Sequence, residues 1–241
     1  MAFEIIDANT VFGPWPSVRA DMEVSRLITA LANHNVSKAL AISTIGALHS
    51  HNDGNAETIR VCSENESLVP VATLDPRGYF GPPSIVATLA DQGFRMFRFF
   101  PILQEWSLDL ASFGDVLDAL SSINLPVMVQ ANETGCPSAL AGNLIGRQNT
   151  FILEGVSFEN MAETVSVMRK YDNVMADTRE LRVPGALRFL VDQIGADRVV
   201  FGSGCLRSSL AAALAYIMET EISDDDKAKI LGGNMKRLLG G

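Results

Sequence analysis

Charged and amide side chains directly follow several short apolar runs, and these are the residues that could bind a ligand or do chemistry. Arg98 lies within an aromatic run, where burying an unpaired guanidinium would be costly. We expect it either to pair with an internal carboxylate, such as Glu133 or Glu154, or to hold an anionic ligand. Gln130 and Asn132 follow another apolar run and add neutral hydrogen-bonding groups.

Nucleophiles and bases are scarce in this sequence. Cys205 follows Ser203 in a glycine-rich turn, and its thiol could attack a carbonyl only if the thiolate were stabilised, for which no base is assignable. Glu154 is the other candidate catalytic residue. His49 and His51 are weaker metal candidates, which form either a relocated ligand pair or part of a solvated loop before a helix. The solvated loop is favoured, because no carboxylate pattern accompanies the two histidines.

The bulk composition excludes several classes of protein. Apolar residues make up 47% and charged residues 20% of the 241 residues, which is the balance of a globular domain. The net charge of −9 leaves no basic surface for nucleic acid. No apolar run approaches the ~18 residues that span a bilayer, and we expect no signal peptide and no membrane contact. The three cysteines are irregularly spaced, which favours reduced thiols in the cytoplasm.

Short apolar runs alternate with longer amphipathic segments along the chain. Strands are predicted over residues 4–7, 37–42, 69–74, 94–99, 126–130, 150–154, 173–177 and 199–202. Helices are predicted over residues 22–33, 83–90, 108–121, 160–171, 183–194 and 208–219, with weaker helical patterns over 55–64 and 135–146. Short connectors rich in Gly, Pro, Asn and Asp separate these elements, as expected for turns between strands and helices.

This series of eight strand–helix pairs predicts a closed (β/α)8 barrel, formed by one domain over residues 1–241. An open doubly wound sheet is the alternative. Such a sheet normally has a flexible, glycine-rich phosphate turn after its first strand, and here that turn is the stiff sequence Gly13-Pro14-Trp15-Pro16. An extra C-terminal helix is predicted after the barrel, because Ser223 is a typical N-cap and three aspartates follow it.

Five segments of the sequence carry a resemblance to a known family. They are residues 5–13 (IIDANTVFG), 72–76 (ATLDP), 93–98 (GFRMFR), 198–205 (RVVFGSGC) and 230–240 (ILGGNMKRLLG). These segments resemble the amidohydrolase-related branch of the amidohydrolase superfamily, whose members are metal-dependent hydrolases and decarboxylases. The resemblance implies a (β/α)8 barrel with its chemistry at the carboxyl-terminal ends of the strands.

The resemblance also implies a metal site, for which this sequence lacks most of the ligands. Members of the family usually read Asp-x-His-x-His-x-Gly at the first strand and Phe-Gly-Ser-Asp at the last, and they bind Zn²⁺ or a similar ion. The corresponding positions here are Asn9, Val11, Gln130, Gly204 and, on the sixth strand, either Glu154 or Gly155. Neutral amides do not replace the imidazole and carboxylate donors that zinc needs, so we expect no metal cofactor.

Three functions stay open at this point. The favoured one is an amidohydrolase-like barrel that binds a small polar or anionic ligand, such as a carboxylate, without a metal. The residues expected to bind it are Asn9, Arg98, Gln130, Asn132, Glu133 and Ser203. The second is a metal-independent hydrolase, lactonase or decarboxylase, in which arginine and amide groups polarise a carbonyl. The third is a non-catalytic scaffold or interaction protein.

Two further expectations concern partners and charge pairs. Members of the resembled family often form homodimers, although no interface signal is visible in this sequence. Asp177 and Arg179 stand at the end of the seventh predicted strand, where a salt bridge is favoured over a catalytic role.

Overall fold

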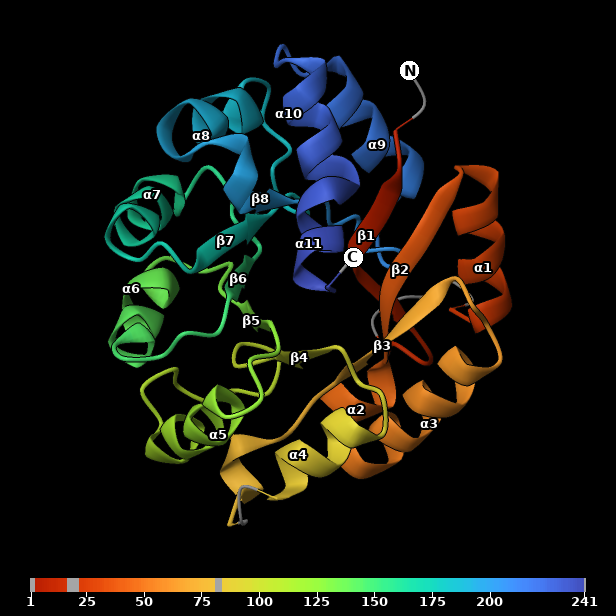
Figure 1. Ribbon diagram of the computed structural model, residues 1–241, viewed down its shortest axis with the longest axis vertical. Coiled ribbons are helices and arrows are strands. Elements are labelled where there is room, and N and C mark those ends of the chain that lie inside the picture. Colours follow the sequence, from red (N-terminus) through yellow and green to blue (C-terminus); the bar gives the residue numbers. More distant parts are fainter. Residues whose placement is uncertain (1–2, 17–21, 81–83, 241) are drawn as a thin grey trace.

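The computed structural model describes residues 3–16, 22–80 and 84–240, which form a barrel of parallel strands with helices around it (Figure 1). The strands follow one another around the sheet in chain order, and each pairs in parallel with the next. Their bounds are β1 Ile5–Phe12, β2 Val36–Ser43, β3 Leu68–Ala72, β4 Met96–Phe99, β5 Val127–Gln130, β6 Phe151–Glu154, β7 Val174–Asp177 and β8 Val199–Val200.

Helices connect successive strands and cover the outside of the barrel. They are α1 Val24–Asn33, α2 Thr44–Leu48, α3 His51–Ser63, α4 Ser84–Asp91, α5 Ala111–Ser121, α6 Cys136–Ala141, α7 Met161–Lys170, α8 Ala186–Ile194 and α9 Leu210–Glu219. Short 3₁₀ turns lie at Pro76–Gly78, Gly142–Leu144 and Ala196–Arg198. Because each strand is followed by a helix that returns the chain to the same end, all strands run in one direction.

Hydrogen bonds between β1 and the last strand region close the barrel. Thr10 and Cys205 form a parallel bridge, the backbone N–H of Ala8 donates to the carbonyl of Phe201 at 2.8 Å, and that of Val11 donates to Cys205 at 2.7 Å. These bonds pair the first strand with the last, as in a sheet closed on itself. The prediction of a closed (β/α)8 barrel is therefore confirmed, and the open doubly wound sheet is wrong.

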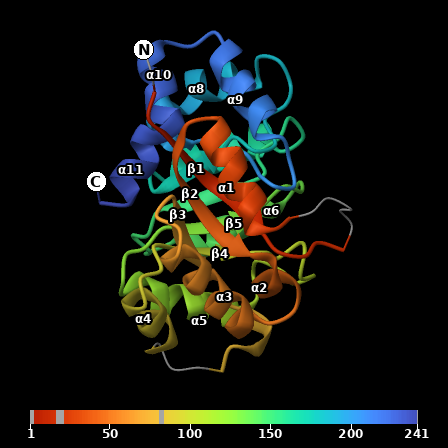
Figure 2. The same cartoon turned by 90° about the vertical axis from the view of Figure 1, so that its right-hand side faces the viewer.

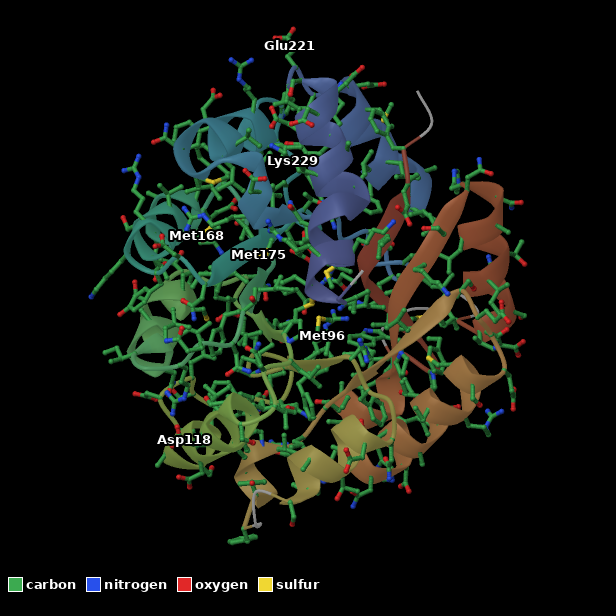
Figure 3. The ribbon with its side chains drawn as sticks, viewed as in Figure 1. Met96, Asp118, Met168, Met175, Glu221 and Lys229 are labelled. Atoms are coloured by element: carbon green, nitrogen blue, oxygen red, sulfur yellow. The ribbon has the colours of Figure 1, made fainter. Side chains whose placement is uncertain are left out.

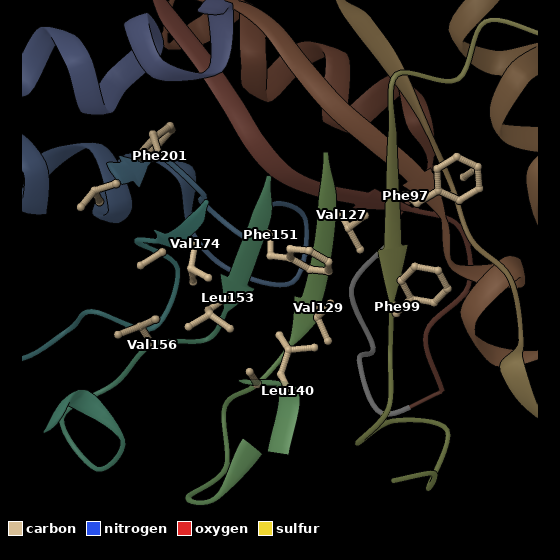
Figure 4. Close-up of a cluster of buried hydrophobic side chains, with 14 of the residues drawn as sticks. Phe97, Phe99, Val127, Val129, Leu140, Phe151, Leu153, Val156, Val174 and Phe201 are labelled. Atoms are coloured by element: carbon tan, nitrogen blue, oxygen red, sulfur yellow. The ribbon is translucent and has the colours of Figure 1, made fainter. Parts of the chain in front are cut away.

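Strict alternation along the strands separates two apolar clusters. The outward residues, among them Phe97, Phe99, Val127, Phe151 and Val174, pack under the helices (Figure 4). The inward residues form a second cluster inside the barrel, which includes Met96, Met128, Ile152 and Met175, and Figure 3 shows Met96 and Met175 near the barrel axis. Since side chains repeat with a period of two, the next inward positions are Arg98, Gln130, Glu154 and Asp177. The same alternation that builds the core thus aims four polar side chains inward at the strand ends.

The chain ends in α10 Asp224–Ala228, a π-helical turn Lys229–Gly233 and α11 Asn234–Leu238, and these cover the end at which the strands begin (Figures 1 and 2). Ser223 caps α10 by accepting a hydrogen bond from the backbone of Asp226 at 3.1 Å. Met235 packs into the inner cluster. A Cβ on Gly232 would lie 2.4 Å from the carbonyl of Glu4, so this helix meets β1 closely only because the residue is glycine.

The predicted elements are confirmed in type and order, with small differences at their bounds. The first strand runs five residues beyond its predicted end, to Phe12, while β8 is shorter than predicted. The weaker helical pattern 55–64 belongs to α3, and 135–146 contains α6 and a 3₁₀ turn. The predicted start at residue 83 lies outside the described residues. In the part of the chain that the structure describes, no helix has the length and apolar character needed to cross a bilayer.

Candidate functional site

The inward side chains at the strand ends form a buried ion cluster rather than an open site. Arg98 binds Glu154 through both donors of its guanidinium edge, Nε to Oε2 at 2.9 Å and Nη2 to Oε1 at 2.6 Å. Arg179, just beyond β7, donates to the same Oε1 through Nη1. Both Arg98 and Glu154 are about 2% exposed. Burial raises the pKa of Glu154, but the two arginines outweigh it and hold the pKa at about 2, so Glu154 is ionised.

Asp177 lies beside this cluster and has a raised pKa. Its Oδ2 accepts from Nδ2 of Asn9 at 2.7 Å, and its Oδ1 accepts from the backbone of Gly155 at 3.1 Å. Burial, together with the negative charge of Glu154, raises the pKa of Asp177 to about 7. Asn9 reaches it because the register of β1 shifts between Asp7 and Thr10, and such an irregularity redirects a side chain.

A third buried carboxylate, Asp7, holds the turn after β8 in place. Its oxygens accept from the hydroxyl and the backbone N–H of Ser203 and from the backbone of Asn9. Burial raises the pKa of Asp7 to about 6, although the hydrogen bonds from Ser203 and Asn9 oppose the rise. Asp7 therefore braces the first and last strands against each other, in agreement with a position that precedes the ligands of the family.

The segment after β4 covers the centre of the barrel mouth, by which we mean the carboxyl-terminal end of the strands. The backbone of Leu103 donates to Oε1 of Gln130 at 3.1 Å, and Nε2 of Gln104 donates to the carbonyl of Ala47 at 3.0 Å. The ring of Phe100 lies 4.9 Å from the guanidinium carbon of Arg98. Both Arg98 and Gln130 therefore contact this segment, which leaves Arg98 buried and Gln130 partly exposed.

An open cavity of about 490 Å³ lies to one side of the mouth, between the ends of β7 and β8 and the start of α9. Arg179 and Arg207 line it together with Ser203, Ser208 and Tyr216. Its apolar wall comes from Leu181, Ala212 and Ala213. A polar end beside an apolar wall suits a small organic molecule that carries a charged group.

Arg207 is the most distinctive group of this cavity. Its guanidinium carbon lies 4.1 Å from the ring centre of Trp15, and it forms no ion pair with any carboxylate in the described ranges, whereas Arg179 and Arg182 both do. Burial, and then the positive charges of Arg179 and Arg98, lower the pKa of Arg207 to about 10. Among the described residues this half-buried positive charge has no ion-pair partner, and a charge held in that way costs folding free energy.

The predicted site residues divide into three groups. Asn9, Arg98, Glu154 and Ser203 converge at the mouth, but only Ser203 lines the cavity. Gln130 contacts the segment after β4, while Asn132 and Glu133 are exposed, and Glu133 lines a separate hollow beside Cys136. His49 is exposed beyond α2, and His51 begins α3 near Asp75.

The structure shows how the residues of two open alternatives lie. Glu154 ends β6 and points inward, whereas Gly155 has φ +91° and a Cβ there would lie 2.4 Å from that of Asn132. Arg98 pairs with Glu154, one of the two predicted carboxylates. The expected bridge of Arg179 also exists, but its hydrogen-bonded partner is Glu154 rather than Asp177.

Cys205 has the wrong environment for a nucleophile. Its side chain is 3% exposed, and burial, aided by the charge of Asp7, raises the pKa of the thiol to about 12. A thiol that stays protonated at neutral pH reacts slowly. Sequence reasoning missed Arg207, although its place two residues after Cys205, in the turn that follows the last strand, was a positional signal.

The three buried carboxylates predict an unusual dependence of stability on pH. The pKa values of Asp7 and Asp177 are raised on folding, so their contribution is complete below about pH 4 and is lost as the pH rises through about 6 and 7. Glu154 has a lowered pKa, so its contribution is present above about pH 4.5 and is lost as the pH falls toward 2. We therefore expect the free energy of unfolding to be highest near pH 4–5.

Urea unfolding at a series of pH values checks this expectation. Stability should fall by a few kcal/mol between pH 5 and 8, since each unit of pKa shift corresponds to about 1.4 kcal/mol. The substitution Asp177→Asn should make that slope shallower, whereas Asp192→Asn, on the exposed surface of α8, should leave it unchanged. A stability that rises from pH 5 to 8 would contradict the raised pKa values.

The fold and the site define a (β/α)8-barrel protein with a cationic cavity at the carboxyl-terminal ends of its strands. A family model described as "Amidohydrolase" matches residues 81–241, more than half of the chain. The chain belongs to the amidohydrolase family, as the resemblance of the sequence implied. No curated protein matches the chain at a significant level.

Several solved structures share the fold over nearly the whole chain. 5-Carboxyvanillate decarboxylase from Sphingomonas paucimobilis has a TM-score of 0.77 and 12% identity, with 99% of both chains covered. A dihydroxybenzoic acid decarboxylase from a Polaromonas species, solved with bound manganese and an inhibitor, has a TM-score of 0.78 and 14% identity over 99% of this chain and 97% of that one. A probable 2-pyrone-4,6-dicarboxylic acid hydrolase from Acinetobacter baumannii, with citric acid bound, has a TM-score of 0.71 and 15% identity over 99% of this chain and 100% of that one. At these identities the likeness shows the fold alone.

The groups at the mouth of this barrel do not fit a divalent cation such as that manganese. Both oxygens of Glu154 are bound by guanidinium groups, and the carboxyl of Asp177 is occupied by Asn9 and Gly155. Within the described ranges, no group of three or more His, Cys, Asp or Glu side chains could hold a metal ion. Two buried arginines would also repel a divalent ion at close range.

Proposed function

We propose that this protein binds a small carboxylate-bearing molecule in the cavity at the barrel mouth, with Arg207 as the main anchor and without a metal ion. The observation that carries the proposal is the unpaired charge of Arg207, which lines the cavity and lacks an ion-pair partner among the described residues. A planar guanidinium binds a carboxylate through two parallel hydrogen bonds. The ligand would supply the missing counterion.

The remaining walls of the cavity are consistent with such a ligand. Ser208 adds a hydroxyl group to the lining, while Leu181 and Ala213 offer apolar surface. Tyr216 contributes its ring, because its hydroxyl is hydrogen-bonded to the backbone of Val183 and Leu187. The volume of about 490 Å³ is within the range typical of sites for small organic molecules. The structural relative that carries citric acid offers further support, because a polycarboxylate is accommodated on the same fold there.

A metal-independent enzyme on the same fold is the second candidate. It is favoured by Ser203, whose hydroxyl lines the cavity and donates to the carboxylate of Asp7, since a carboxylate with a pKa of about 6 could accept a proton from a bound molecule near neutral pH. The same experiment separates the two candidates, because a ligand recovered unchanged after incubation indicates binding only, and a product indicates turnover.

The proposal is tested by titrating the protein calorimetrically with citrate, succinate and benzoate, each beside its uncharged amide, after divalent ions have been removed with a chelating resin. At least one carboxylate should bind and raise the melting temperature, and its amide should bind at least tenfold more weakly, since a hydrogen bond to a charged group contributes about 1.5–3 kcal/mol. The proposal fails if no carboxylate binds below 10 mM, which is roughly the weakest affinity of interest, or if the amides bind equally well.

A further inference from the structure

Arg179 occupies an unusual place among the charged groups of the mouth. Its side chain is 8% exposed and contacts Glu154 and, at 3.5 Å, Glu180. Burial opposes its charge, but Glu154, Asp177 and Glu180 outweigh this and raise the pKa of the guanidinium. Arg179 is therefore a permanent cation held between the carboxyl groups at the ends of β6 and β7.

The space that Arg179 fills exists because residue 204 is glycine. A Cβ on Gly204 would lie 2.7 Å from Nε of Arg179 and 3.0 Å from its Cδ, so no larger side chain fits there while the arginine is in place. Nε of Arg179 is buried and has no hydrogen-bond partner in the described ranges. Gly204 also has a φ of +70°, a backbone conformation that favours glycine, so both the backbone and the arginine keep a side chain out of this position.

The carboxylate oxygens that a metal ion would need are already occupied by hydrogen-bond donors. Oε1 of Glu154 accepts from both Arg98 and Arg179, and Oε2 accepts from Arg98. Asp177 is held by Asn9 and by a backbone N–H. A divalent cation would have to displace a guanidinium from a buried carboxylate, and breaking a buried ion pair in this way is strongly unfavourable.

We infer that Arg179, together with the absence of a side chain at Gly204, is a built-in cation that occupies the position of a divalent metal ion and excludes it. The charge of the mouth is then supplied by the polypeptide itself and does not depend on divalent ions. This inference goes beyond the proposed carboxylate site, and it does not depend on which ligand the cavity binds.

The inference is tested by building a metal site back into the barrel. The double variant Arg179→Met with Gly204→Asp removes the cation and places a third carboxylate beside Glu154 and Asp177, and three carboxylates suit Mn²⁺. Binding of Mn²⁺ is measured by calorimetry and by the rise of the melting temperature. The double variant should bind Mn²⁺ at least tenfold more tightly than the natural sequence and melt at a higher temperature with the ion than without it.

Matched variants separate the loss of the arginine from unrelated effects. Arg182→Met removes an arginine of the same cavity that is 63% exposed, and it should not create Mn²⁺ binding. Gly204→Asp alone should be destabilised by the contact with Arg179 and should gain less binding than the double variant. Arg179→Met alone should gain some affinity for Mn²⁺, because it frees one contact on Glu154. If the double variant does not fold, this single variant tests whether Arg179 excludes the ion.

Two results would overturn the inference. One is stoichiometric Mn²⁺ binding by the natural sequence as tight as that of the double variant, which would mean that Arg179 excludes nothing. The other is a double variant, or Arg179→Met where only that variant folds, with native circular dichroism and no more affinity for Mn²⁺ than Arg182→Met has. Failure of carboxylate binding in the cavity would leave these measurements unaffected, so the two proposals can fail separately.

Discussion

Replacing Glu154 by glutamine is expected to lower the free energy of unfolding by about 3–5 kcal/mol, the largest effect of any single substitution at the barrel mouth. The amide keeps the size of the side chain but leaves Arg98 buried without its counterion, and leaves Arg179 with only its longer contact to Glu180. Glu154 is ionised, with a pKa of about 2, so its negative charge is lost in full at neutral pH. Urea unfolding at pH 7 with an unchanged m-value measures the effect.

The matched control for this substitution is Glu180→Gln. Glu180 also pairs with Arg179, but it is 26% exposed, and partly solvated ion pairs contribute about 0–1 kcal/mol. Adding Arg98→Met to the glutamine variant should restore part of the lost stability, because the buried cation that has lost its counterion is removed with little change of volume. A loss below about 1 kcal/mol in the single variant, or no recovery in the double variant, would contradict a net contribution of the ion cluster.

The fold could be predicted from the sequence because alternation and chain order are properties of the chain itself. Side chains alternate between the two faces of a strand in a run such as Phe97-Arg98-Phe99. Because both aromatic rings are buried between the barrel and its helices, the arginine must point into the barrel. Eight such runs in series, each followed by an amphipathic helix, have few topologies available to them. The pairing of Arg98 with Glu154 follows from the same argument, since both positions point inward.

Which parts of the barrel mouth are open and which are covered could not be predicted in this way. Whether Arg98 and Gln130 meet solvent depends on the segment after β4, where Leu103 and Gln104 bind across the mouth to Gln130 and Ala47. Nothing in the local pattern of that segment fixes where it folds. The predicted centre of the site is therefore covered, and the cavity lies instead beside Ser203.

The roles of Asn9 and Arg179 also depended on geometry that a sequence does not display. Strict alternation from Ala8, which faces inward, would turn Asn9 outward, and the irregular register of β1 reverses this. In the sequence, Gly204 could be recognised only as a position at which the resembled family usually has an aspartate. Only the close approach of Arg179, whose Nε would lie 2.7 Å from a Cβ on Gly204, shows that an arginine from the turn after β7 takes up the space.

Replacing Arg207 by methionine is expected to weaken binding of the best carboxylate ligand by about 10- to 100-fold, which corresponds to the 1.5–3 kcal/mol of hydrogen bonds to a charged group. Burial and neighbouring arginines lower the pKa of Arg207 to about 10. The guanidinium is still charged at neutral pH, but holding that charge lowers the free energy of unfolding. Methionine retains the apolar stem that lies on Trp15. Stability in the absence of ligand should therefore stay unchanged or rise, while affinity falls.

Opposite changes in affinity and stability distinguish a binding residue from a structural one. Arg207→Lys keeps the charge but loses the planar fork, and it should bind the carboxylate with intermediate affinity. Arg182→Met serves as the control, because that side chain is 63% exposed and already paired with Glu180, and calorimetric affinity should change less than threefold, or about 0.7 kcal/mol. If Arg207→Met binds the carboxylate as tightly as the natural protein, the anchor lies elsewhere; if it unfolds more easily, the guanidinium stabilises the fold rather than the ligand.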